Sequence, residues 1–140
     1  MDKLIIDTGF FVALLSSKDR YHKQAVILRP KLEKRQWWTT WPVITETVYL
    51  LSGQVPNCFR SIAFLVKEDA LRLLDLREDH FDRMASLIHK YRDLPMDLAD
   101  ASLVILAEEL GMGDIASTDM RDFQTYRFKN HKPFRNVLAP

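Results

Sequence analysis

Leu4-Ile5-Ile6-Asp7-Thr8-Gly9 is the stretch that decides the fold, because an uninterrupted apolar run ends there on a carboxylate. Three large apolar residues in a row predict a short strand buried on both faces, as in parallel sheets. The Asp-Thr-Gly that follows is typical of the turn after such a strand. A carboxylate beside core residues is costly to desolvate unless hydrogen bonds or a cation compensate it. Asp7 is therefore either a cap for the next helix or part of a polar site.

The same alternation of short apolar runs and helix-like segments continues along the chain. Further strands are predicted at 36–40, 70–74, 115–117 and 137–138. Helices are predicted at 10–15, at 20–34 with Asp19 as N-cap, and at 42–51, 56–66, 78–91 and 97–110. Short, continuously apolar strands that alternate with helices predict a parallel sheet covered on both faces. We therefore expect an α/β fold with a short sheet of about five strands.

Length and composition favour one soluble domain that spans residues 1–140. The chain has 140 residues, 47% of them hydrophobic and 28% charged, which suits a single core and not two. No apolar run approaches the roughly 20 residues that cross a bilayer, and the start lacks a secretory signal. Cys58 is the single cysteine, so no internal disulfide forms. We expect a cytoplasmic protein with no membrane association and no zinc site.

The net charge of +1 hides a strong segregation of charge along the chain. Residues 93–119 contain seven acids and no Lys or Arg, whereas residues 121–140 contain five basic residues and one acid. One interpretation is a solvated surface on which the charges cluster by chance. The other is an acidic metal pocket beside a basic tail that meets a polyanion.

Glu46 lies in a predicted helix among apolar neighbours such as Ile44 and Val48. A glutamate in that position either belongs to the polar stripe of an amphipathic helix or points inward as a ligand. The sequence around Glu46 leaves both interpretations open.

Asp97 and Asp100 lie three residues apart in the first turn of one predicted helix, so they share a face. Asp97 follows a proline and a methionine, an arrangement that favours a helix N-cap. Asp100 differs, because from residue 98 to 107 only Asp100 and Ser102 are polar. An acid in so apolar a helix needs a partner, which the helix dipole supplies in part and a cation completes.

Asp119 directly follows the strand predicted at 115–117, as Asp7 follows the first strand. If these two strands are neighbours, both carboxylates lie at the carboxyl edge of the sheet, where open α/β sheets bind ligands. Asp122 precedes Phe123 and suits a cap of a final turn or a supporting position. We therefore favour Asp119 over Asp122 as the ligand.

Taken together, these acids predict a site for a hard divalent cation. A donor set of carboxylates without Cys or His favours Mg²⁺ or Mn²⁺. Such ions keep some water ligands and act on phosphate esters.

Four segments carry a resemblance to a known family: IIDTG at 5–9, WPVITE at 41–46, DLADAS at 97–102 and STDMRDF at 117–123. Their order, their spacing and the chain length resemble PIN-domain ribonucleases, above all the VapC-type toxins of toxin–antitoxin pairs. The resemblance implies a three-layer α/β/α sandwich. It also implies Mg²⁺- or Mn²⁺-dependent cleavage of RNA that leaves a 5′ phosphate and a 3′ hydroxyl.

Site residues follow from this resemblance position by position. The acidic site falls on Asp7, Glu46, Asp100 and Asp119, as catalytic residues and metal ligands. Asp97 matches an acid that only part of the family has. Thr8 and Thr118 match hydroxyl positions near the metal. The chain departs from the family at Gly9, where many members have serine.

Partners follow in the same way. The resemblance implies an RNA substrate, a small antitoxin protein and a homodimer. We expect four basic residues of the tail to hold the RNA backbone, unless the tail meets a partner: Arg121, Lys129, Lys132 and Arg135. The segment 59–66 and the tryptophans at 37, 38 and 41 either pack in the fold or form interfaces, and the tryptophans alternatively stack on RNA bases.

Rival functions fit the sequence less well. A haloacid-dehalogenase-like enzyme needs a second aspartate two positions after the first, where this chain has Gly9. A response-regulator receiver needs an early pair of adjacent acids and a lysine after a late strand, and neither is present. The remaining alternative is a catalytically silent PIN-like module that binds RNA or protein, which metal-dependent turnover would distinguish.

Overall fold

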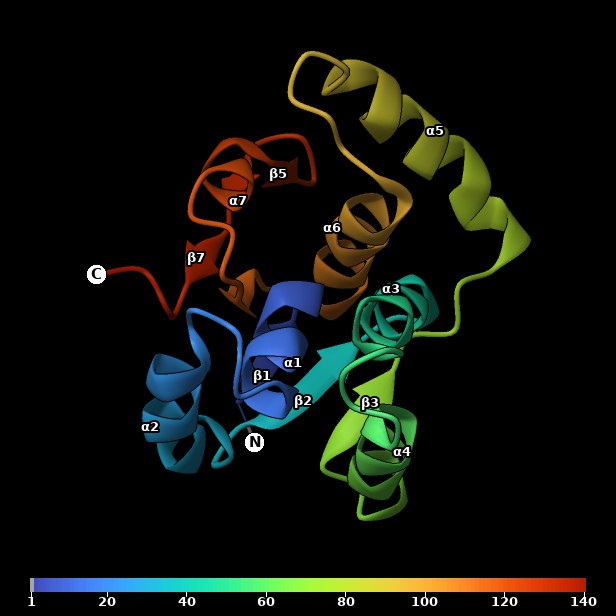
Figure 1. The fold of residues 1–140 in the computed structure, drawn as a ribbon. Helices are drawn as coiled ribbons and strands as arrows, with labels where there is room; N and C mark the ends of the chain where they lie inside the picture. Colours follow the sequence, from blue (N-terminus) through green and yellow to red (C-terminus); the bar gives the residue numbers. More distant parts are fainter. Residues whose placement is uncertain (1) are drawn as a thin grey trace.

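A computed structural model describes residues 2–140, which form a central parallel sheet between layers of helices (Figure 1). The sheet has five strands in the order β3-β2-β1-β4-β7, and every pair is parallel. Its strands are β1 (Lys3–Ile6), β2 (Gln36–Thr39), β3 (Leu71–Leu73), β4 (Asp114–Ala116) and β7 (Arg135–Asn136). The predicted α/β fold with about five strands is confirmed.

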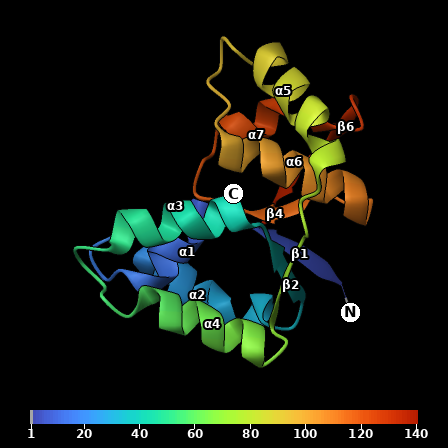
Figure 2. The same ribbon diagram turned by 90° about the vertical axis from the view of Figure 1, so that its right-hand side faces the viewer.

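The main helices are α1 (Thr8–Leu15), α2 (His22–Leu32), α3 (Trp41–Leu51), α4 (Cys58–Lys67), α5 (Phe81–Lys90) and α6 (Leu98–Leu110). A short 3₁₀ helix, η1 (Glu78–His80), precedes α5, and a short helix, α7 (Asp122–Thr125), follows β4. Figure 2 shows α1, α2 and α4 on one side of the sheet, with α5 and α6 on the other. The helix α3 contacts both α1 and α6.

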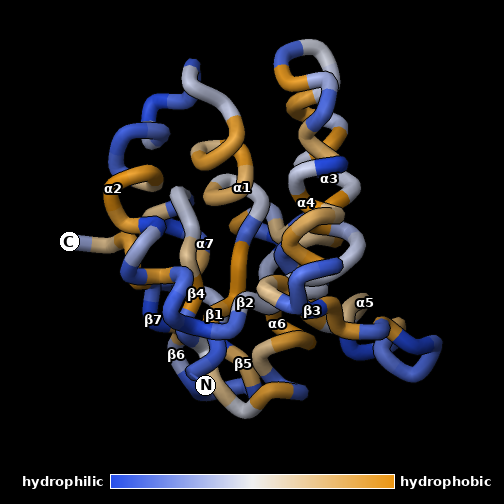
Figure 3. Tube along the Cα trace, turned by 90° about the horizontal axis from the view of Figure 1, so that it is seen from below, coloured by the Kyte–Doolittle hydropathy of each residue, from blue (hydrophilic) through white to orange (hydrophobic). Residues whose placement is uncertain are grey.

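The central strand β1 lies in the core because its residues Leu4, Ile5 and Ile6 have no polar side chain to solvate. All three are fully buried. Figure 3 shows apolar colour concentrated on β1, on α1 and along parts of α6, with hydrophilic colour on the outer turns. Within residues 2–140, no helix has the length and apolar character needed to cross a membrane.

The helix α6 is the most buried helix of the fold, as its apolar sequence predicts. From Ala99 to Ala107 every residue except Asp100 is buried. Asp97 caps the start of the helix, and its side chain accepts a hydrogen bond from the Asp100 amide at 2.8 Å. Gly111 ends the helix with a left-handed backbone (φ 69°), a conformation that glycine adopts without strain. Asp100 is therefore the one acid in the buried part of α6, from Ala99 to Ala107.

Several predicted boundaries are wrong by about two residues, including the start of α1 at Thr8 and the end of α2 at Leu32. The helix α2 begins at His22 and not near residue 20, because Asp19 accepts a hydrogen bond from the Tyr21 amide (2.9 Å) and holds a turn before the helix. The helix α4 begins at Cys58 and not at residue 56. The last strand is Arg135–Asn136 and not 137–138, since the Arg135 amide bonds to the Gly113 carbonyl.

A small antiparallel hairpin, β5 (Arg127–Phe128) with β6 (Lys132–Pro133), was not predicted from the sequence. Its turn uses left-handed backbone at Lys129 (φ 50°) and Asn130 (φ 65°). Asparagine adopts that conformation more readily than most residues, which explains part of the turn.

The three tryptophans do not form one cluster. Trp37 is buried, and its indole Nε1 donates to the Leu32 carbonyl at 2.9 Å. Trp38 is half-buried and packs against the core. Trp41 begins α3 and is 55% exposed, so packing accounts for Trp37 and Trp38 but not for Trp41.

Candidate functional site

The carboxyl edge of the sheet brings the two strand-end acids together. β1 pairs with β4 in parallel register, with Ile6 opposite Ala116. The Asp7 amide continues this pairing by donating to the Ala116 carbonyl at 3.1 Å. Asp7 and Asp119 consequently follow neighbouring strands on the same edge, which is where ligands bind in open parallel sheets.

Asp7 is both a helix cap and a buried acid. Its carboxylate accepts a hydrogen bond from the Thr8 amide on Oδ1 and one from the Ser117 hydroxyl on Oδ2, both at 2.7 Å. The side chain is nevertheless only 7% exposed. Burial outweighs these hydrogen bonds and, with the nearby charges of Glu46 and Asp119, raises the pKa of Asp7 to about 6.

Asp100 points from the first turn of α6 toward the same edge. Its carboxylate accepts a hydrogen bond from the Tyr126 hydroxyl at 3.2 Å. Burial, together with the charges of Asp97 and Asp7, raises the pKa of Asp100 to about 8. A carboxylate held in so unfavourable a place is the kind of group that a bound cation stabilises.

Asp119 is tied to the chain that follows it. Its Oδ1 accepts hydrogen bonds from the amides of Arg121 (3.0 Å) and Asp122 (2.9 Å). Burial opposes ionisation, but these bonds and one with the Asp122 side chain hold the pKa of Asp119 below its usual range. Asp119, and not Asp122, therefore fixes this turn, while Asp122 contacts Asp119 and pairs with the Arg121 guanidinium at 3.2 Å.

Glu46 reaches the site from α3. It is half-buried, and its charge contributes to the raised pKa of Asp7. Glu46 and Asp97 line one shallow groove of about 560 Å³, together with Trp41 and Tyr49. The structure thus places the five acids of the predicted site around the carboxyl edge.

The donor chemistry of this edge fits a hard divalent cation. Its side chains offer oxygen atoms, and the Thr8 hydroxyl is buried with no hydrogen-bond partner among residues 2–140. Two of the acids, Asp7 and Asp100, have raised pKa values because burial disfavours their charged forms and other negative charges lie nearby. In the described part of the chain, however, no three acid, His or Cys side chains are gathered closely enough to ligate one ion as they stand.

Comparison with protein families decides the classification of the chain. The model of the PIN domain family matches residues 4–129. The chain belongs to the PIN domain family. The family predicted from the sequence motifs is thereby confirmed.

Comparison with solved structures finds the same fold in another protein. The crystal structure of Mycobacterium tuberculosis VapC20, described as a toxin that cleaves the sarcin–ricin loop, matches with a TM-score of 0.76 and 20% identity. The match covers 93% of this chain and 99% of VapC20, so the two share their fold over nearly their full lengths. Among the curated proteins, no sequence matches this one.

Sequence reasoning missed two residues that orient the acids of this PIN domain. The Ser117 hydroxyl donates to Asp7 and accepts from the Asp119 amide at 3.0 Å, so it links the two acids. The Asn136 side chain in turn accepts from the Ser117 amide (3.2 Å) and donates to the Ser117 carbonyl (2.8 Å). A hydroxyl at the end of a strand was a visible signal for Ser117, whereas nothing in the sequence indicated Asn136.

Tyr126 is a third missed residue. Its ring is fully buried against Tyr91 and Phe123, with centroids 4.9 Å and 5.2 Å away, and its hydroxyl touches Asp100. Burial and the nearby acids raise the pKa of Tyr126, so its hydroxyl stays protonated and donates. Tyr126 therefore fixes the direction of the Asp100 carboxylate.

Removing the Tyr126 hydroxyl is expected to weaken metal binding by the PIN domain without unfolding it. In the Tyr126→Phe variant the ring stays packed while the Asp100 carboxylate loses its hydrogen-bond donor. The Mn²⁺ concentration that gives half of the maximal rise in melting temperature should therefore increase severalfold to tenfold. The measurement is a Mn²⁺ titration followed by thermal shift. Tyr91→Phe is the matched control, because the Tyr91 hydroxyl accepts a hydrogen bond from the Arg127 amide (3.0 Å), whereas the Tyr126 hydroxyl donates to an acid. Equal metal titrations for the two variants would contradict a role of Tyr126 at Asp100.

The departure at Gly9 has a steric cause. A Cβ atom at position 9 would lie 2.0 Å from the Thr118 hydroxyl oxygen, so Thr118 occupies the space of a side chain there. We expect Gly9→Ala to destabilise the PIN domain by about 1–3 kcal/mol, because the clash forces a shift. Urea unfolding would measure this loss.

The matched control for this clash is the double variant Gly9→Ala/Thr118→Ala. It removes the atom that meets the new Cβ, and so it should recover most of the lost stability. A double variant no more stable than Gly9→Ala would show that Thr118 is not the obstacle.

The four basic residues expected to bind RNA lie in different places. Arg121 is 78% exposed and adjoins the acids. The Lys129 amide bonds to Glu108 near the far end of α6, and Lys132 lies in the hairpin that packs there. Arg135 pairs with Asp114 at the start of β4, on the opposite edge of the sheet.

Proposed function

We propose that this PIN domain is a divalent-metal-dependent endoribonuclease and the toxin of a VapBC-type pair. The observation that carries the proposal is the set of acids at the carboxyl edge, where the buried Asp7 and the half-buried Asp100 have raised pKa values. Carboxylates with raised pKa values are costly for a fold unless a cation or hydrogen bonds compensate their charge, and they cluster at functional sites. The likeness to VapC20 over nearly the whole fold supports the toxin assignment.

Asp7, Glu46, Asp100 and Asp119 would hold Mg²⁺ or Mn²⁺, with Asp97 beside them. Once bound, such an ion supplies a Lewis acid for the phosphodiester and lowers the pKa of water. The protein's own groups hold the acids in place. Ser117 orients Asp7, Tyr126 orients Asp100, and the free Thr8 hydroxyl offers a donor to the site.

The partners that we propose are RNA, a small antitoxin and a second copy of the chain. Exposed apolar side chains on α4 support a protein interface there, since Phe59 is 47% and Phe64 is 60% exposed. The other candidate interface is Trp41 with its neighbour Tyr49 on α3, both exposed. An antitoxin encoded by the neighbouring gene would support the toxin assignment.

The test is cleavage of a panel of end-labelled RNAs, including a sarcin–ricin loop, with Mg²⁺, Mn²⁺ or EDTA. We expect cutting with either metal and none with EDTA. The fragment ends would identify the target and show whether 5′ phosphates form. No cutting of any RNA, together with a melting temperature that ignores both metals, would favour a silent binding module instead.

A further inference from the structure

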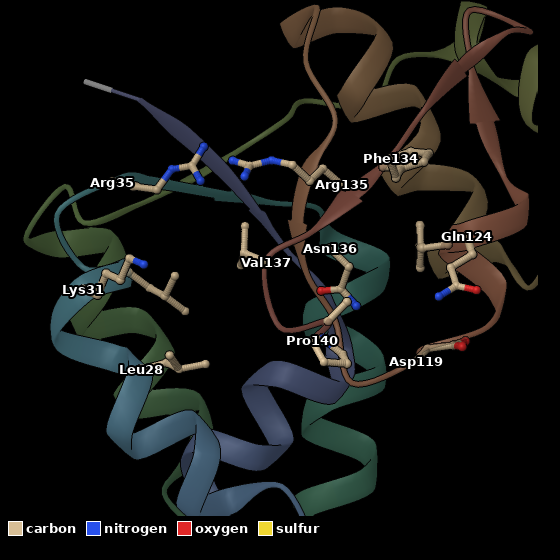
Figure 4. Close-up of a pocket in the computed structure, with 13 residues that line it drawn as sticks. Leu28, Lys31, Arg35, Asp119, Gln124, Phe134, Arg135, Asn136, Val137 and Pro140 are labelled. Carbon is tan, nitrogen blue, oxygen red and sulfur yellow. The ribbon is translucent and has the colours of Figure 1, made fainter.

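A cleft of about 730 Å³ opens between α2 and the C-terminal segment, residues 134–140 (Figure 4). One wall comes from Leu28, Lys31 and Arg35, and the other from α7 and the C-terminal segment. Asp119 lines one end of this cleft. The cleft therefore begins at an acid of the proposed active site and leads away from it.

Three cations line the other end of the cleft. Figure 4 shows Lys31 and Arg35 on one wall with Arg135 facing them. Arg35 and Arg135 donate to the same Asp114 oxygen, at 2.8 Å and 2.6 Å, so one acid is shared by two cations. Lys31 is exposed and has no ion-pair partner among residues 2–140. This end of the cleft consequently carries positive charge that is only partly neutralised.

Between the two ends, the cleft walls combine apolar side chains with the amides of Gln124 and Asn136. Leu28 and Val137 are half-buried and line it from opposite sides. An unpaired nucleic-acid strand presents bases on one side and phosphates on the other, and proteins hold it in grooves that combine apolar or aromatic surface with positive charge. The groove on the other side of the site, lined by Glu46 and Asp97, has no Lys or Arg in its lining.

We propose that this cleft holds the single-stranded segment of RNA that flanks the scissile bond, with its phosphates near Lys31, Arg35 and Arg135. The inference rests on the proposed function, because it takes Asp119 as part of the cleavage site. It assigns RNA binding to Lys31 and Arg35, two residues outside the basic tail. Lys129 and Lys132 are left without a role in this path, since they lie at the far end of α6.

The test compares Lys31→Gln with Lys34→Gln. Lys34 is also exposed and follows α2, but it does not line the cleft, so it is the matched control. Binding of a fluorescent single-stranded RNA is measured by anisotropy at several salt concentrations, in an Asp100→Asn background that prevents cutting. We expect Lys31→Gln to weaken binding about threefold to tenfold and to make the slope of log K against log salt shallower by about 0.7.

Three outcomes decide the inference. The inference is supported if the slope of log K against log salt is shallower for Lys31→Gln but not for Lys34→Gln. It also requires that the protein bind the single-stranded RNA more tightly than the same RNA annealed to its complement. Equal binding and slopes for the two variants overturn it. If RNA binding is weakened by Lys31→Gln but the wild-type protein cuts no RNA, the proposed nuclease is refuted. The cleft then remains a binding surface for single-stranded RNA.

Discussion

Replacing Asp7 by asparagine is expected to reduce RNA cleavage on the order of a thousandfold while the fold stays intact. Asparagine has the same shape, and its Oδ1 can still accept the hydrogen bond that Asp7 takes from the Thr8 amide. The variant loses the negative charge that would bind the cation. Because that charge is buried at a cost, its removal should not lower the melting temperature.

The measurement is the initial rate of cleavage with saturating Mn²⁺, accompanied by a melting curve. Asp82→Asn is the control, since Asp82 is an exposed aspartate in the first turn of α5, away from the site. We expect Asp82→Asn to cut at the wild-type rate. Wild-type cleavage by a folded Asp7→Asn protein would remove Asp7 from the mechanism.

The second large effect concerns stability against pH. Asp100 has a folded-state pKa of about 8 against an ordinary value of 3.8, so the folded protein binds this proton more tightly than the unfolded chain. The stability that the folded protein gains from holding this proton is fully present below pH 4 and is lost as pH rises from about 4 to about 8. Asp7 acts in the same direction between about 4 and about 6. The metal-free protein should therefore become less stable across this range.

The Asp100→Asn variant should lose much less stability than the wild type as pH rises. An amide carries no charge at any of these pH values, so at pH 8 the metal-free variant should be more stable than wild type by about 3 kcal/mol. In a domain of this size, that difference raises the melting temperature by roughly 5–10 °C. Melting curves at pH 4, 6 and 8 with EDTA give the comparison, and curves that coincide at pH 8 would refute the raised pKa.

Adding metal should narrow the difference in melting temperature between the two proteins. A cation that binds only the folded state stabilises it, so millimolar Mn²⁺ should raise the melting temperature of the wild type by several degrees. Asp100→Asn should respond much less, while Asp82→Asn should respond as the wild type does. If Mn²⁺ does not change the melting temperature of the wild type, that result would argue against a metal site at this edge.

The fold could be predicted because local patterns coincide with tertiary roles. An apolar run such as that of β1 has one stable place, the middle of a sheet covered on both sides. The nearly uniform apolarity of α6 likewise indicated a central helix. Asp7 and Asp119 could be placed on one edge because parallel strands align their carboxyl ends.

What could not be predicted depends on contacts between distant segments. Ser117, Tyr126 and Asn136 are ordinary polar residues until the fold brings them to the acids. The hairpin of β5 and β6 was missed because two-residue strands show no alternation of polar and apolar side chains. The boundaries of short elements also shift by a residue or two with the hydrogen bonds at their ends.

The hydrogen bonds from Asn136 through Ser117 to Asp7 have a consequence for biosynthesis. Asp7 precedes Asn136 along the chain, so it is synthesised first, and most elements of the fold are made between the two. A nascent chain that lacks β7 holds Asp7 without the strand that positions its serine partner. The acids at the ends of β1 and β4 are therefore held in their final arrangement only after the last strand of the sheet has been made.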